Sequence, residues 1–160
     1  MAPLLLAFLI PFLRPQQIET GSDPAAWLQL IADFQARGVR VRSDHPRCAE
    51  PDLDGLYRRG DRELVVCERG DRSLTLRHEG WHLVQTLCLH GRPWLSHGEV
   101  EQRLQDRDRR ELEQLVSPDR RGREAEARVM AVLPVARYLQ EVDQACRLML
   151  PRHASQPVDG

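Results

Sequence analysis

Hydrophobic residues recur at helical spacing between Pro24 and Gly38. Ser22 or Asp23 followed by Pro24 is typical of a helix start, and Gly38 is typical of the residue that ends one. The apolar positions of this first predicted helix are Trp27, Leu28, Leu30, Ile31 and Phe34.

Three short segments after this helix have the composition of strands. Residues 39–41 alternate apolar and polar side chains, as a half-buried strand does. Residues 56–58 and 63–66 flank a turn-forming stretch, Arg59-Gly60-Asp61-Arg62, and therefore predict a β-hairpin. We expect these strands to form a small antiparallel sheet.

A second helix is predicted over residues 74–87, where apolar residues again follow the helical repeat. Ser73 is a candidate cap for its first turn. The apolar positions are Leu76, Trp81, Leu83, Val84 and Leu87.

The second half of the chain is predicted to be helical. Residues 93–117 are heavily charged but contain recurring leucines, which favours one or two surface helices over a disordered segment. Residues 123–133 predict a further helix, and a last helix follows Pro134. The fold class is therefore α+β, mainly helical, with the small sheet beside the helix of residues 74–87.

Length and composition place these elements in one domain. A chain of 160 residues with 41% hydrophobic content suits a single domain with a modest core, which we assign to residues 22–152, followed by a polar tail at 153–160. The net charge of −1 gives no electrostatic reason to expect a nucleic acid or an anionic membrane as partner.

The first residues form a separate segment. Residues 3–13 are apolar but too short to span a bilayer, which takes about 20 residues, whereas their length suits the core of a signal peptide. We assign residues 1–21 to a signal-like segment and linker. This predicts an exported protein that contacts a membrane only through its N-terminus, as a signal or an uncleaved anchor; the alternative is a buried N-terminal segment.

Four cysteines support export, because disulfides persist in oxidising compartments. Four cysteines allow three pairings. We favour Cys48 with Cys67 and Cys88 with Cys146, since each pair joins neighbouring predicted elements. The alternative is four reduced thiols in a cytoplasmic protein.

The predicted helix of residues 74–87 contains His78-Glu79-Gly80-Trp81-His82. Residues four apart share one face of a helix, so His78 and His82 would direct two imidazoles to one point, with Glu79 beside them. Imidazole is a good ligand for Zn²⁺, and a carboxylate next to the zinc can take a proton from the attacking water. His-Glu-x-x-His on a helix is therefore the zincin signature.

A zincin needs a third metal ligand. The metzincin pattern would place Gly and His where Gln85 and Cys88 stand, so it does not apply. The helix of residues 123–133 offers Glu124 or Glu126. We favour Glu124, because it shares a face with small residues that would let two helices lie close together, and keep Glu126 as the alternative.

Together these motifs resemble the gluzincins. The pattern Glu124-Ala125-Glu126-Ala127 is similar to the Glu-x-x-Ala-Asp/Asn helix of the CAAX prenyl peptidases and of the soluble peptidases of phage-repressor and radiation-response systems. The first glutamate of that motif binds zinc in those families, which implies the same role for Glu124 and a minimal zincin-like domain. Arg128 departs from the expected Asp or Asn. The chain also resembles small exported His-Glu-x-x-His proteins of cyanobacteria, a family without an assigned substrate.

The sequence therefore predicts a zinc-dependent hydrolase of gluzincin type, acting on a peptide or protein. Its predicted residues are His78, His82 and Glu124 for Zn²⁺, and Glu79 as general base. Tyr138 is a further candidate, because a tyrosine can donate a hydrogen bond to a developing oxyanion. The alternative function is a non-catalytic protein in which a degenerate zincin fold binds metal for stability.

Overall fold

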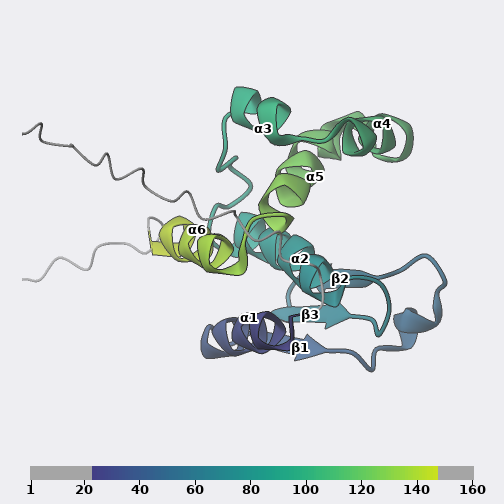
Figure 1. Cartoon of the computed structure of the whole chain (residues 1–160), viewed down its shortest axis with the longest axis vertical. Coiled ribbons are helices and arrows are strands. Elements are labelled where there is room, and N and C mark those ends of the chain that lie inside the picture. Colours follow the sequence, from purple (N-terminus) through teal and green to yellow (C-terminus); the bar gives the residue numbers. More distant parts are fainter. Residues whose placement is uncertain (1–22, 148–160) are drawn as a thin grey trace, which may run out of the picture.

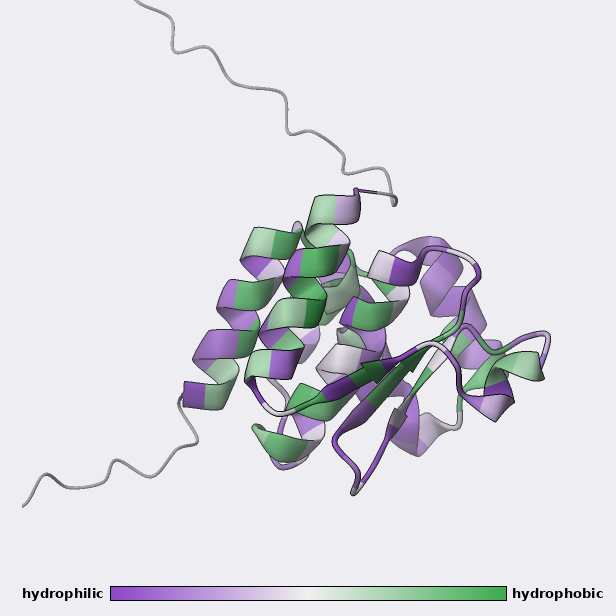
Figure 2. Ribbon diagram, turned by 90° about the horizontal axis from the view of Figure 1, so that it is seen from below, coloured by the Kyte–Doolittle hydropathy of each residue, from purple (hydrophilic) through white to green (hydrophobic). Residues whose placement is uncertain are grey.

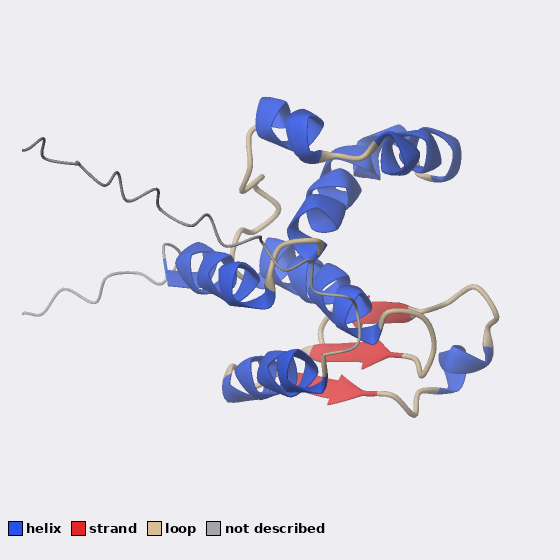
Figure 3. Cartoon of the chain, in the orientation of Figure 1, coloured by secondary structure: helices blue, strands red, loops and turns tan. Residues whose placement is uncertain are grey.

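The computed structural model of the chain describes residues 23–147. Figures 1 and 3 show a small sheet beneath one central helix, with the other helices around that helix. The elements in chain order are α1 (Pro24–Ala36), β1 (Arg40–Arg42), the 3₁₀ helix η1 (Pro46–Ala49), β2 (Gly55–Arg58), β3 (Glu63–Val66), α2 (Arg72–Leu87), α3 (His97–Arg103), α4 (Asp106–Leu115), α5 (Pro118–Ala131) and α6 (Val135–Arg147).

The first helix and the hairpin form where the sequence predicts them. The Asp23 side chain accepts a hydrogen bond from the N–H of Ala25, and Pro24 is the first residue of α1. Gly38 follows the helix with a φ of +74°, a backbone angle that glycine tolerates without a steric cost. β2 and β3 are antiparallel neighbours joined by the predicted turn.

The prediction of an antiparallel sheet is wrong in one respect, because the sheet is mixed. Its strand order is β1-β3-β2, and β1 runs parallel to β3 with Val41 opposite Leu64. All four residues of β3 are buried, so this strand takes the centre of the sheet and pairs on both sides. In Figure 2 most of this strand has the green colour of hydrophobic residues. β2 is consequently an edge strand, and it lies against α2.

Helix α2 carries the His-Glu-x-x-His motif at the centre of the molecule (Figure 1). The N-cap is Asp71, whose carboxylate accepts a hydrogen bond from the N–H of Leu74 at 2.9 Å. Ser73, the predicted cap, is instead a buried residue inside the first turn. A carboxylate near the positive end of the helix dipole stabilises α2 at this terminus.

The face of α2 at Gly80 packs against α1 and α6. A Cβ atom on Gly80 would lie 2.3 Å from Cζ of Phe34 and 2.8 Å from the hydroxyl oxygen of Tyr138, which is closer than real atoms approach. Trp81 and Tyr138 are fully buried nearby, with ring centroids 6.1 Å apart in an edge-to-face arrangement. Glycine therefore allows three helices to meet at the motif.

The charged segment forms two short surface helices, α3 and α4, as expected. Ser96 and Glu99 form a capping box at the start of α3. Figure 1 places α3 and α4 beside α5, which lies between them and α2. Leu112 is the buried residue of α4, and the rest of that helix is half-buried or exposed.

Both predicted disulfides are present, Cys48–Cys67 and Cys88–Cys146. The first ties η1 to the end of β3, and the second ties the end of α2 to α6. Two disulfides indicate an oxidising environment. Among the described residues no helix is long and apolar enough to cross a membrane. The signal-like segment, residues 1–21, and the polar tail, residues 153–160, lie outside the described residues.

Replacing Gly80 with alanine is expected to lower the free energy of unfolding by about 1–3 kcal/mol, because the added methyl group overpacks the contact with Phe34 and Tyr138. Gly122→Ala is the matched control. Among the described residues no atom outside its own helix lies within 4 Å of a Cβ at Gly122, so alanine there should stabilise α5 by about 0.5–1 kcal/mol. Urea unfolding of both variants measures the difference, and equal effects would contradict the packing argument.

Candidate metal centre

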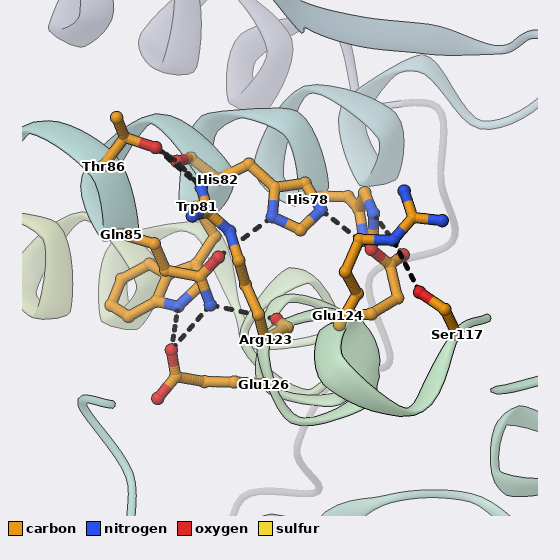
Figure 4. A network of polar contacts seen from close by, with 10 residues as sticks. His78, Trp81, His82, Gln85, Thr86, Ser117, Arg123, Glu124 and Glu126 are labelled. Atoms are coloured by element: carbon orange, nitrogen blue, oxygen red, sulfur yellow. Dashed lines mark hydrogen bonds and ion pairs between the residues drawn. The ribbon is translucent and has the colours of Figure 1, made fainter. Parts of the chain in front are cut away.

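His78 and His82 stand one helical turn apart on α2 and present their imidazoles on the same side. The ring centroids lie 4.8 Å apart and the ring planes are nearly perpendicular. Figure 4 shows both rings directed toward α5. The helical spacing of the motif therefore produces the convergence that the sequence predicts.

Glu124 on α5 meets both imidazoles. Its two carboxylate oxygens lie 3.0 Å from Nε2 of His78 and 3.1 Å from Nε2 of His82. Ligand atoms of these three residues all lie within 4.8 Å of one another. Ala127 and Ala131 on α5 are buried, and their small side chains allow α5 to pack closely against α2.

This group could hold a metal ion. Two imidazole nitrogens and one carboxylate oxygen form a donor set that binds divalent transition metals. Burial alone would raise the pKa of Glu124, but its hydrogen bonds with His78 and His82 outweigh burial and hold the pKa well below its usual range. The carboxylate is therefore ionised at neutral pH, as a metal ligand has to be.

Glu79 lies beside this group in a less polar setting. Burial raises the pKa of its carboxyl above the ordinary value, and the charges of His78 and His82 act in the opposite direction. Gly55 on β2 faces this carboxylate, because a Cβ there would lie 3.3 Å from Cγ of Glu79 and 2.5 Å from Thr75. The absence of a side chain at Gly55 thus allows the edge strand to approach the motif.

A cleft of about 680 Å³ opens at the group, and His78, Glu79 and Glu124 line it. One wall is the segment from Asp52 to Gly55, which leads into the edge strand β2. The opposite wall comes from α4 and from the C-terminal part of α5. His78, Glu124 and Glu79 therefore share one solvent-accessible space.

Arg128 holds the outer wall of the cleft. It lies 2.9 Å from the carboxylate of Asp108 and 2.8 Å from that of Glu111, both on α4. The gluzincin resemblance leads one to expect Asp or Asn at position 128. Arg128 instead joins α5 to α4 through these ion pairs. All three side chains are partly exposed, so these pairs contribute modestly to stability.

Glu126, the alternative third ligand, lies outside the group. Its carboxylate is 3% exposed and accepts four hydrogen bonds. The donors are Nε1 of Trp81, Nε2 of Gln85 and the backbone N–H groups of Trp94 and Leu95. Being two residues apart on α5, the two glutamates point in different directions, and only Glu124 meets the imidazoles.

Tyr138 is placed in the core of the protein. Its hydroxyl donates a hydrogen bond to the backbone carbonyl of Arg77 at 2.8 Å, and burial raises the pKa of this hydroxyl well above its usual range. The side chain packs at Gly80, which lies two residues from each histidine. Tyr138 is fully buried and is not among the residues that line the cleft with His78, Glu79 and Glu124.

Gln85 is a polar residue at the centre that sequence analysis did not single out. Its Oε1 lies 2.9 Å from Nδ1 of His82, the ring nitrogen on the far side from Glu124 (Figure 4). The one available signal is its spacing, since residue i+3 of a helix lies beside residue i. The spacing alone does not predict a hydrogen bond between Gln85 and His82, because a solvent-exposed polar residue of a helix can have the same spacing.

Comparison of the chain with known protein families, with curated proteins and with solved structures finds no match. The geometry of the centre is therefore the basis for a functional proposal.

The purified wild-type protein is expected to bind one divalent transition-metal ion per chain, and His82→Ala and Glu124→Gln to lose it, because each removes one of three ligands. Metal content after dialysis measures this. Glu113→Gln is the control, since this glutamate is exposed on α4 and outside the group. Equal metal content in all four proteins would contradict the assignment.

Proposed function

We propose that this protein is a zinc-dependent hydrolase of gluzincin type that cleaves peptide bonds. The observation that carries the proposal is the convergence of His78, His82 and Glu124 beside a cleft that His78, Glu79 and Glu124 line. Two histidines and a glutamate are the ligand set of catalytic zinc in several peptidases.

Each residue has a distinct role in the proposed reaction. His78, His82 and Glu124 would hold the zinc ion, which would supply Lewis acidity to water and to the substrate carbonyl when bound. Glu79 would accept the proton of the attacking water and pass it to the leaving amine. The raised pKa of Glu79 suits this exchange, since a general base that is also to act as an acid works best when its pKa lies near the working pH.

The cleft supports a peptide substrate. Its volume, about 680 Å³, lies in the range of ligand-binding clefts. Gly55 of the edge strand β2 lines it, and an edge strand offers N–H and C=O groups to an extended peptide. Exposed carboxylates on one wall and the charged helix α4 on the other also suit a polar substrate.

We also propose that the protein works outside the cytoplasm. The two disulfides support this, because small domains that contain them are stable in oxidising compartments. The apolar N-terminal residues of the sequence are consistent with export.

Glu79→Gln is expected to abolish peptide cleavage, by at least about 10²–10⁴-fold, because the amide cannot accept the proton of water. Zinc content and the unfolding transition should stay as in the wild type, since Glu79 is not among the three ligands. The measurement is cleavage of a mixed-sequence peptide library followed by mass spectrometry.

Zinc-free protein, prepared with a chelator and then reloaded, is the control for contaminating peptidases. If wild-type protein with one zinc per chain cleaves no peptide in the library, the site is a non-catalytic metal site and the proposal fails.

A further inference from the structure

The side-chain amide of Gln85 has a defined orientation. Its Nε2 lies 2.7 Å from Oε2 of Glu126 and 3.0 Å from the carbonyl oxygen of Arg123. Both partners are acceptors, so the NH₂ group has to lie on their side. The amide oxygen therefore faces His82.

This orientation determines which nitrogen of His82 carries the proton. Oε1 of Gln85 can only accept a hydrogen bond, and it lies 2.9 Å from Nδ1 of His82. Nδ1 therefore carries a proton, which it donates to Oε1. Nε2 lies 3.1 Å from the Glu124 carboxylate, where the candidate metal site lies, and is the nitrogen left to bind an ion.

Glu126 in turn fixes Gln85. Its Oε1 accepts the backbone N–H groups of Trp94 and Leu95, and its Oε2 accepts Nε1 of Trp81 and Nε2 of Gln85. All four neighbours are donors, which is the arrangement that an ionised carboxylate satisfies. Glu126 therefore orients the amide of Gln85, and Gln85 orients the ring of His82. His82 donates to Gln85, and Gln85 donates to Glu126.

We propose that Gln85 and Glu126 are positioning residues of the metal centre, which hold His82 in the tautomer that presents an unprotonated Nε2 to the ion. The inference rests on the metal site of the proposed function. In this inference Glu126 contributes to metal binding through Gln85 and His82, and it is not itself a ligand. Among the described residues, a hydrogen-bond partner is recorded for Nδ1 of His82 and not for Nδ1 of His78.

The proposal predicts an effect from an isosteric change. In Glu126→Gln the amide oxygen stays with the N–H groups of Trp94 and Leu95, because these backbone groups cannot rotate. The new NH₂ group then meets two donors, Nε1–H of Trp81 and Nε2–H of Gln85, so the hydrogen bond from Gln85 to residue 126 is lost. Gln85 is then less firmly held with its oxygen toward Nδ1 of His82, and the tautomer with a proton on Nε2, which competes with zinc, becomes more populated.

We expect Glu126→Gln to weaken zinc binding by about 10- to 100-fold, as the loss of partners behind a metal-bound histidine commonly does. Gln85→Leu removes the acceptor for Nδ1 of His82 and keeps a side chain of similar size, so it should weaken zinc binding by a similar factor. Competition with a chromophoric zinc chelator measures all of these constants in the full chain.

Thr86→Val is the matched control. Thr86 is on the same turn of α2 and bonds to the carbonyl oxygen of His82 and to Arg123, but not to the imidazole. Its zinc affinity should stay within about 2-fold of the wild type, a smaller change than the loss expected for a partner of the ring itself. A purely structural role of the network would instead give Thr86→Val, Gln85→Leu and Glu126→Gln similar zinc affinities.

A second measurement needs no variant. Long-range ¹H–¹⁵N correlation spectra of the zinc-loaded wild type report which nitrogen of each ring carries a proton. In His82, a proton on Nδ1 with Nε2 bound to zinc supports the proposal, and a proton on Nε2 with Nδ1 bound to zinc overturns it. If the wild type binds zinc but Glu126→Gln binds it equally tightly, this inference fails alone; if the wild type binds no zinc, the proposed function fails with it.

Discussion

The close approach of α2 and α5 is the constraint on which the rest of the structure depends. Glu124 reaches both imidazoles at 3.0 and 3.1 Å only because the two helices pack closely. Ala127 and Ala131 provide the small side chains at this contact, and both are buried. Larger residues there would separate the helices, and a displacement of about 1 Å is enough to disturb a catalytic or metal-binding geometry.

Helix α2 is in turn fixed on its other sides. Gly80 lies against Phe34 of α1 and Tyr138 of α6, and Gly55 lets the edge strand lie against Thr75 and Glu79. The disulfide from Cys88 joins the end of α2 to α6. The histidines therefore stand on a rigid helix rather than on a loop, which is how a precise ligand geometry is maintained.

Sequence reasoning succeeded where a local repeat carries the information. The helix under the motif, the hairpin and the choice of Glu124 over Glu126 all follow from spacing and side-chain size. It failed where long-range packing decides. No local pattern shows that β1 pairs in parallel with β3. The cap of α2 was a local choice between neighbouring polar residues, and the prediction of Ser73 in place of Asp71 was wrong.

Polar networks between elements were equally out of reach of the sequence. Gln85 and Glu126 are 41 residues apart, and their hydrogen bond exists only because α2 and α5 are neighbours. The candidate role of Tyr138 rested on chemistry alone, and its hydroxyl is occupied by the carbonyl of Arg77. The four cysteines form disulfides and are unavailable as ligands, so the group within the described residues offers three donors. Structural zinc sites usually have four protein ligands, whereas catalytic sites have three and an open position. Three donors would leave one coordination position open on a bound ion, and His78, Glu79 and Glu124 line the accessible cleft at this point, which is the arrangement on which the proposed function rests.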